Sequence, residues 1–325
     1  MDGYHFHTWT DDDDRSNVDS VVLDAEVAPF CEAMAAFAVT ADAVSGMRAA
    51  PAGLSENSTS DPVERADHIV SEDPAVVVRS YRPRNAAAVL PCVYWIHGGG
   101  YVVGNYEMDD ARLARWSVEF QCVVTSVEYR LAPETAYPGP LDDCFAGLQW
   151  VFEHADELGV DRERVGLGGI SAGGGLAAGL ALLARDRSLR LSFQLLESPM
   201  LDDRQVTSSS QLDGLPIWSR ESNEFGWRSY LGDLYGRDDL PPYAAPARAA
   251  DLVGLPPTFV IVGGADGFRD ENIEYALRLN QAGVPTELHV LPGAPHGVAS
   301  LFGSTSIAVR WETLVGEWLG RQLET

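Results

Sequence analysis

The stretch from Val165 to Leu176, V-G-L-G-G-I-S-A-G-G-G-L, constrains this chain more than any other. An apolar run ends on glycines, and a serine, further glycines and a helical pattern of small residues follow. Residues 169–173 fit the G-x-S-x-G pattern of a nucleophile elbow, a sharp strand-to-helix turn that exposes a serine hydroxyl. The turn strains the backbone at Ser171 and brings the flanking residues together, which favours glycine there. By itself, the pattern also fits a glycine-rich turn in which Ser171 caps the helix.

Strands are predicted to alternate with helices along most of the chain. Strands are expected at residues 66–70, 76–81, 89–96, 122–127, 165–170, 191–196, 258–262 and 287–291. Helices are expected within 21–47 and at 111–120, 141–158, 176–184, 271–282 and 307–323, and a long polar stretch without an expected element runs from 202 to 236. This order predicts an α/β fold with a mostly parallel, doubly wound sheet of eight strands. Ligands bind at the carboxyl ends of strands in such sheets.

Composition excludes several classes of function. The 325 residues include 48 acidic and 23 basic side chains, a net charge of −25, which argues against nucleic acid or an anionic membrane as a partner. The sequence contains no lysine, which excludes chemistry based on a Schiff-base lysine, a P-loop lysine or a Ser-x-x-Lys motif. Neither a membrane span nor a signal peptide is expected, so we expect a cytoplasmic protein.

Cysteine and histidine spacing gives little indication of metal binding. The four cysteines are widely spaced and form no C-x-x-C pair, so they are expected to be buried free thiols in a reducing compartment (Cys31, Cys92, Cys122 and Cys144). His5 and His7 stand near aspartates in an N-terminal arm, but no ligand spacing repeats there. This spacing predicts no metal site, and the serine hydrolase chemistry inferred below needs neither a metal nor an organic cofactor.

A glycine-rich motif follows the strand predicted at 89–96. It reads His97-Gly98-Gly99-Gly100-Tyr101 and matches the HGGG-type motif that supplies oxyanion-hole N–H groups in lipases and esterases. Two such donors, together with the N–H of Ala172, would bind the oxyanion of a tetrahedral intermediate. A plain glycine turn is the alternative interpretation, and His97 is expected to be a structural member of the loop.

A base and an acid are expected in loops further along the chain. His296 lies in Pro-Gly-Ala-Pro-His-Gly, just after the last predicted strand, whereas His289 lies within that strand and is expected to pack there. Asp266 comes first after the strand predicted at 258–262, and Asp270 is expected to cap the following helix. The order Ser171, Asp266, His296 is the order of an α/β-hydrolase triad.

Several further stretches complete a resemblance to the hormone-sensitive-lipase family of α/β-hydrolases, in particular to its bacterial esterase branch of the heroin-esterase type. The similar stretches are W-I-H-G-G-G-Y (95–101), Y-R-L-A-P-E (129–134), G-I-S-A-G-G (169–174), P-M-L-D-D (199–203), R-D-E (269–271) and P-H-G (295–297). The resemblance implies a triad of Ser171, Asp266 and His296 and an oxyanion hole of Gly99, Gly100 and Ala172. It also implies cap helices over residues 1–50, a catalytic domain over 51–325 with a cap insertion at about 204–245, and a homodimer formed through the last strand.

The sequence departs from the family pattern at three places. Ile170 stands where the family usually has Asp, which predicts the loss of a supporting hydrogen bond. The acid loop lacks the usual proline after Asp266, which predicts a looser loop. Glu197, near a strand end, is expected to be either a buried structural carboxylate or a residue facing the site.

These features predict a carboxylic ester hydrolase that acts through an acyl-enzyme on small-molecule esters. Tyr101 and Trp218 are the candidate substrate contacts, and the aromatic residues at 218–230 favour short acyl chains by narrowing a capped pocket. An amidase or peptidase on the same triad, or a non-catalytic small-molecule receptor on this fold, remain alternatives.

Overall fold

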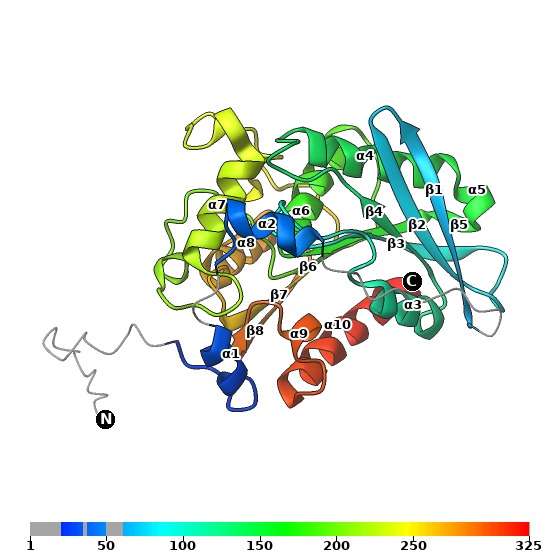
Figure 1. Ribbon diagram of the computed structural model, residues 1–325. Coiled ribbons are helices and arrows are strands. Elements are labelled where there is room, and N and C mark those ends of the chain that lie inside the picture. Colours follow the sequence, from blue (N-terminus) through cyan, green and yellow to red (C-terminus); the bar gives the residue numbers. More distant parts are fainter. Residues whose placement is uncertain (1–20, 35–37, 50–60, 325) are drawn as a thin grey trace, which may run out of the picture.

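The computed structural model describes residues 21–34, 38–49 and 61–324. Eight strands form one sheet, as the sequence predicts, and their order is β1-β2-β4-β3-β5-β6-β7-β8 (Figure 1). The strands are β1 (Val63–Glu72), β2 (Ala75–Pro83), β3 (Leu90–Ile96), β4 (Val123–Glu128), β5 (Val160–Ile170), β6 (Gln194–Glu197), β7 (Thr258–Ala265) and β8 (Thr286–Pro295). The pairs β1–β2 and β2–β4 are antiparallel, and the remaining neighbours are parallel.

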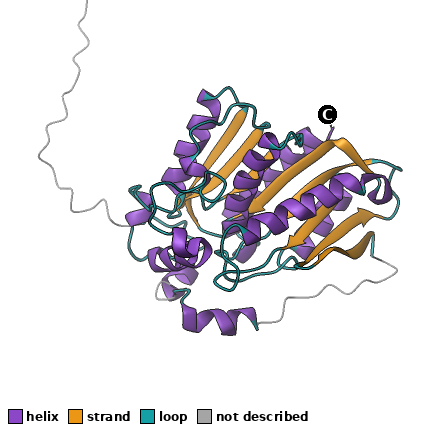
Figure 2. Ribbon diagram, turned by 90° about the horizontal axis from the view of Figure 1, so that it is seen from above, coloured by secondary structure: helices purple, strands orange, loops and turns teal. Residues whose placement is uncertain are grey.

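Two layers of helices cover the sheet, one on each face (Figure 2). One layer contains α4 (Gly139–Glu153), α5 (Ala155–Leu158), α6 (Ala172–Asp186) and α8 (Arg269–Gln281), and the other contains α3 (Asp110–Glu119) and α10 (Ser306–Glu324). Strand β3 is fully buried, and its residues alternate between the two hydrophobic cores. Tyr94 packs with the first layer, while Trp95 packs with the second. This double coverage explains why the strand reads as an unbroken apolar run.

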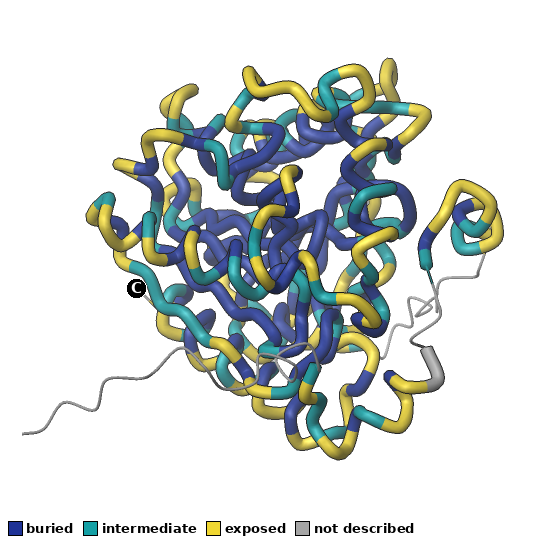
Figure 3. The backbone as a smooth tube through the Cα atoms, turned by 90° about the vertical axis from the view of Figure 1, so that its left-hand side faces the viewer, coloured by how far each residue is buried: buried dark blue, intermediate teal, exposed yellow. Residues whose placement is uncertain are grey.

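Burial increases toward the sheet and the inner helices, as Figure 3 shows. Helix α6 is buried along almost its whole length, which its glycines and alanines allow because small residues let the helix approach the sheet closely. All four cysteines are buried and free, as predicted. In the described part of the chain, no helix combines the length and apolarity needed to cross a bilayer.

Three helices belong to the segments expected to form a cap: α1 (Ala28–Met34), α2 (Ala41–Arg48) and α7 (Arg220–Leu231). The two expected segments touch, since the backbone N–H of Val39 donates to Oγ of Ser222 over 2.8 Å. The expected N-terminal arm, with His5 and His7, and most of the loop expected at 51–62 lie outside the described residues. The division into cap and catalytic domain stays a prediction.

The structure differs from the sequence prediction at three places. The helix expected at 141–158 ends at Glu153, and α5 follows as a separate short helix after His154. Helix α7 lies in the stretch for which no element was expected. Gly226 in its middle weakens the helical signal, whereas Ser219 caps its start by accepting the N–H of Ser222 over 3.2 Å. The short helix α9 (Val298–Leu301) was also not expected.

Candidate active site

Ser171 stands between the end of β5 and the start of α6, where the backbone turns sharply. Its φ of 58° and ψ of −123° lie outside the regions that L-residues normally adopt. Glycine is needed nearby for steric reasons: a Cβ on Gly169 would lie 2.3 Å from the carbonyl oxygen of Gly173, and one on Gly173 would lie 2.2 Å from that of Ile96. The second contact shows that Gly173 lets the elbow pack against the end of β3, which carries the glycine-rich loop.

Ser171, His296 and Asp266 meet although they are far apart in the sequence. Nε2 of His296 lies 2.9 Å from Oγ of Ser171, and Nδ1 lies 2.8 Å from Oδ2 of Asp266. All three residues are buried, with exposed fractions of 6% for Ser171, 7% for His296 and 2% for Asp266. A carboxylate can only accept, so Nδ1–H donates to it and Nε2 is left to accept the serine hydroxyl hydrogen.

Asp266 follows β7 directly and is held in its own turn. Its Oδ1 accepts the N–H of Phe268 over 3.0 Å, which leaves Oδ2 for the imidazole. The expectation that Asp270 caps the next helix is wrong, because α8 begins two residues earlier than predicted, at Arg269, with Phe268 at the N-cap position. Asp270 instead accepts the N–H of Ser209 over 2.7 Å and so ties the acid loop to residues beyond β6.

The glycine-rich loop packs directly against the elbow. A Cβ on Gly98 would lie 3.3 Å from Cβ of Ser171. Gly99 and Gly100 have φ of 114° and 59°, a left-handed backbone that turns successive N–H groups in a direction most residues cannot adopt. Ala172 is the first residue of α6, so its N–H has no acceptor within the helix. These are the three N–H groups predicted to form an oxyanion hole.

His97 takes part in packing within this loop. Its ring stacks on Tyr129 with centroids 4.2 Å apart, and Nδ1 lies 2.8 Å from the carbonyl oxygen of Gly98. Burial lowers the pKa of His97 to about 4, so the ring is neutral at pH 7. A neutral, enclosed imidazole fits the structural place predicted for His97.

The two candidate substrate contacts differ in their surroundings. Trp218 lies over the loop: a Cβ on Gly100 would be 2.0 Å from its Cη2, and its ring centroid is 6.4 Å from that of His296. The Tyr101 side chain is only 1% exposed and stacks on Tyr230 with centroids 4.0 Å apart. The side chain of Tyr101 is therefore not accessible to a substrate in this structure, although it was predicted to contact one. Trp218 lies beside His296.

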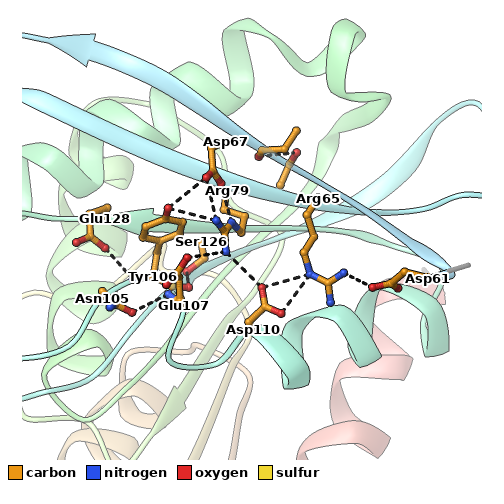
Figure 4. A network of polar contacts seen from close by, with 12 residues as sticks. Asp61, Arg65, Asp67, Arg79, Asn105, Tyr106, Glu107, Asp110, Ser126 and Glu128 are labelled. Atoms are coloured by element: carbon orange, nitrogen blue, oxygen red, sulfur yellow. Dashed lines mark hydrogen bonds and ion pairs between the residues drawn. The ribbon is translucent and has the colours of Figure 1, made fainter. Parts of the chain in front are cut away.

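Beyond the glycines, Tyr106 anchors the far end of the same loop (Figure 4). Its N–H donates to Oε2 of Glu128 over 2.8 Å, and its carbonyl oxygen accepts Oγ–H of Ser126 over 3.2 Å. Its hydroxyl donates to Asp67, and the guanidinium of Arg79 lies 4.5 Å above its ring. Burial raises the pKa of Glu128 to about 7, and the nearby Glu107 adds to this effect.

Glu197 proves to be a buried structural carboxylate. It is 0% exposed, accepts Nε1–H of Trp311 over 2.7 Å and pairs with Arg112, whose Nη2 lies 2.8 Å from Oε1. Its backbone carbonyl accepts the N–H of Ser171 over 2.8 Å, so the residue supports the elbow from β6. The sequence left this choice open because a carboxylate before Ser-Pro at a strand end fits both environments.

A second buried carboxylate, Glu271, received no role in the sequence analysis. Its Oε1 accepts the N–H groups of Leu201 and Asp202 over 2.8 and 3.3 Å. Burial raises its pKa well above the usual range. Glu271 belongs to the R-D-E stretch, and Leu201 and Asp202 belong to the P-M-L-D-D stretch. The presence of both stretches in the sequence could have indicated this contact.

The fold and the site together define a serine hydrolase of the doubly wound type: a mostly parallel sheet carries a serine at a strand-to-helix turn, and an acid and a histidine follow along the chain. The chain belongs to the alpha/beta hydrolase fold family, which it matches over residues 93–300. The resemblance seen in the sequence is thereby confirmed.

Named relatives agree with this assignment. The solved structure of a bacterial heroin esterase is 40% identical, with a TM-score of 0.83, and the match covers 94% of this chain and 99% of that one. Carboxylesterase NlhH of Mycobacterium tuberculosis is 37% identical over 273 residues, which are 80% of this chain and 85% of that protein. Ethyl acetate hydrolase of Pseudomonas putida is 32% identical over 224 residues, or 67% and 70% of the two chains.

Proposed function

We propose that this protein is a serine carboxylesterase that hydrolyses esters of short acyl chains. The observation that carries the proposal is the line of contacts from Oγ of Ser171 through the imidazole of His296 to the carboxylate of Asp266, beside the glycine-rich loop. Relatives named as a carboxylesterase, an ethyl acetate hydrolase and a heroin esterase support the same reaction class.

The reaction follows from the roles that these groups can play. Oγ of Ser171 attacks the ester carbonyl carbon while Nε2 of His296 takes the hydroxyl proton, and the carbonyl electrons move onto oxygen. The N–H groups of Gly99, Gly100 and Ala172 donate to that oxyanion, and each such donor contributes about 3 kcal/mol to the transition state.

Collapse of the first tetrahedral intermediate completes acylation. The imidazolium protonates the leaving alcohol, the C–O bond breaks, and an acyl-serine remains. Water then attacks the acyl carbon, gives a proton to His296, and a second tetrahedral intermediate releases the carboxylic acid and restores Ser171. Asp266 stabilises the charged imidazole during both halves.

The preference for short acyl chains rests on Trp218. Its indole lies against Gly100 and near His296, so it limits the space beside the predicted oxyanion donors. A long chain would have to displace this side chain, whereas an acetyl or butyryl group would not.

The proposal is tested with a panel of p-nitrophenyl esters from acetyl to dodecanoyl, together with matched anilides. We expect hydrolysis of the esters, fastest with acetyl or butyryl, and much slower cleavage of the anilides. Ser171→Ala and His296→Ala should each lower kcat by about 10⁴-fold. His289→Ala is the matched control, because His289 pairs with Glu287 on β8, away from Ser171.

Labelling separates the classes of outcome. A fluorophosphonate should modify the wild type with one equivalent and leave Ser171→Ala unmodified. Absence of labelling together with absence of ester turnover would refute an enzymatic role, and faster cleavage of anilides than of esters would make the protein an amidase. Faster turnover of dodecanoyl than of acetyl esters would refute only the chain-length preference.

We further propose that the protein is a cytoplasmic homodimer joined along β8. This strand is at the edge of the sheet, and among the described residues no strand pairs with its outer side; free buried cysteines are typical of a reducing compartment. Light scattering after size exclusion should give twice the mass of the chain, and fractionation should recover the protein with cytoplasmic markers. A monomer at micromolar concentration would refute the dimer.

A further inference from the structure

The last turn of α2 places one arginine against the glycine-rich loop. Nε of Arg48 donates to the carbonyl oxygen of Val102 over 2.7 Å, and Nη2 donates to that of Ala132 over 2.7 Å. The same guanidinium pairs with both carboxylate oxygens of Glu134, over 2.9 and 3.0 Å. One side chain from the N-terminal segment therefore serves two loops at once, one of which contains the predicted oxyanion donors.

Val102, which accepts a hydrogen bond from Arg48, is itself hydrogen-bonded to Gly99. The N–H groups of Val102 and Val103 both donate to the carbonyl oxygen of Gly99 over 3.0 Å, so residues 99–103 form one compact turn. A Cβ on Gly99 would lie 2.0 Å from the carbonyl oxygen of Val103, which shows how tightly the turn is closed. A shift at Val102 must therefore also move the peptide groups on either side of Gly99.

A second set of bonds closes a ring around the same turn. The N–H of Ala132 donates to the carbonyl oxygen of Tyr101 over 2.9 Å, while the carbonyl of Ala132 accepts from Arg48. The peptide groups at 101–102 and at 132 are thus joined both directly and through the guanidinium. Arg48 has 27% of its side chain exposed, so its bonds form in a partly dehydrated environment where they are stronger than on an open surface.

Helix α2 is itself fixed by packing on the rest of the molecule. Val44 is buried in the same hydrophobic core as Tyr101 and Val102, and Val39 is buried beside it. The N–H of Val39 donates to Ser222 in α7. A cation in the last turn also interacts favourably with the helix dipole, so α2 holds Arg48 in place.

We propose that Arg48 is a positioning residue of the oxyanion hole: it ties α2 to Val102 and so fixes the N–H groups of Gly99 and Gly100 relative to Ser171. The inference rests on the proposed esterase function and deepens it, because it makes the N-terminal helix α2 part of the catalytic apparatus. Arg48 acts through the loop and does not touch the substrate. The effect is expected in the transition state, since the N–H groups bind the charge that develops there.

The test compares Arg48→Ala and Arg48→Lys with the wild type and with Arg228→Ala as a control. Arg228 is an exposed arginine on α7 that pairs with Glu224 and lies 4.6 Å from the ring centroid of Tyr235, so its loss should leave kcat unchanged. Hydrolysis of p-nitrophenyl acetate is measured per active site, counted by the final stoichiometry of fluorophosphonate labelling. Because unfolded protein is not labelled, activity per labelled site is not lowered when a variant contains less folded protein.

We expect Arg48→Ala to lower kcat per labelled site by about 10- to 100-fold with a smaller change in KM, since displacing catalytic groups by about 1 Å has effects of this order. Affinity for a trifluoromethyl ketone, which forms a tetrahedral oxyanion on the serine, should fall by a similar factor to kcat/KM. Arg48→Lys should recover only part of the loss, because an ammonium lacks the planar fork that reaches both carbonyls and Glu134 together.

A purely structural role predicts a different result, namely a lower melting temperature with unchanged kcat per labelled site. If kcat per labelled site of Arg48→Ala is within about twofold of the wild type, the proposal is overturned, because it requires a loss of at least about 10-fold. If the alanine variant does not fold, unchanged kcat in Arg48→Lys overturns it instead. A wild type that neither labels nor hydrolyses esters refutes the esterase function and this role together, whereas an active wild type with an equally active Arg48→Ala refutes this role alone.

Discussion

Replacement of Arg112 by methionine is predicted to destabilise the protein strongly. Nη2 of Arg112 lies 2.8 Å from Glu197 and 3.0 Å from Glu312, and its guanidinium lies 4.4 Å above Trp116. The side chain of Arg112 is 11% exposed and that of Glu197 is 0% exposed. Methionine fills a similar volume, so the main effect is to leave the Glu197 carboxylate buried without its counter-ion.

The magnitude follows from the burial of that pair. Removing one partner of a buried ion pair costs about 3–5 kcal/mol, and the lost cation–π contact adds about 1 kcal/mol. Burial raises the pKa of Glu197, and Arg112 opposes this effect, so the pKa rises further in the variant. A raised pKa in the folded state opposes folding once the group ionises, so the destabilisation of Arg112→Met should increase as pH rises from 5 to 8.

Urea unfolding followed by tryptophan fluorescence measures this effect as a change in midpoint at constant slope. Arg115→Ala is the matched control: Arg115 lies on the same helix and pairs with the same Glu312, but its side chain is 53% exposed. It should cost less than about 1 kcal/mol. The double variant Arg112→Met/Glu197→Gln should recover most of the loss, because the carboxylate of Glu197 is then removed together with its counter-ion. Equal, small effects of Arg112→Met and Arg115→Ala would refute the reasoning.

Three further predictions concern the site and its surroundings. Asp266→Asn should lower kcat by about 10⁴-fold and Asp270→Asn by less than about tenfold, measured with p-nitrophenyl acetate; the reverse order would show that the acid is misassigned. Trp218→Ala should raise the ratio of kcat/KM for hexanoyl over acetyl esters by about tenfold, and an unchanged ratio would exclude Trp218 as the limit on chain length. Burial raises the pKa of Glu128 from 4.5 to about 7, so its ionisation opposes folding across this range. Glu128→Gln should therefore be more stable than the wild type at pH 8, by up to about 3 kcal/mol in urea unfolding, with the advantage shrinking toward pH 4.5; an advantage independent of pH would contradict this.

The sheet was predictable because its signal is local. Strands covered on both faces read as apolar runs, such as β3, and the glycines beside Ser171 mark a turn that few other sequences can adopt. The positions of Ser171, Asp266 and His296 were also predictable, since each of these residues directly follows a strand. Whether Ser171, Asp266 and His296 act as a triad is a matter for the variants described above.

The remaining contacts depend on long-range packing that no local pattern encodes. The sequence around Arg48 shows an ordinary helix end, and its partners lie 54 and 84 residues further along the chain. Glu197 could be placed only when α3 and α10 were seen to converge on β6. Helix α7 was missed because its stability comes from buried aromatic residues, which outweigh the low helix propensity of Gly226.

The close approach of Trp218 to Gly100 makes the evolutionary histories of these two positions interdependent. Any side chain at position 100 would occupy space already filled by the indole, so a methyl group there requires a smaller residue at 218 beforehand. Of the two mutational orders that lead to such a double variant, only the one that first shrinks position 218 avoids a steric clash at the intermediate. A directed-evolution library that varies the loop alone, with the tryptophan retained, would therefore miss every solution that carries a side chain at 100.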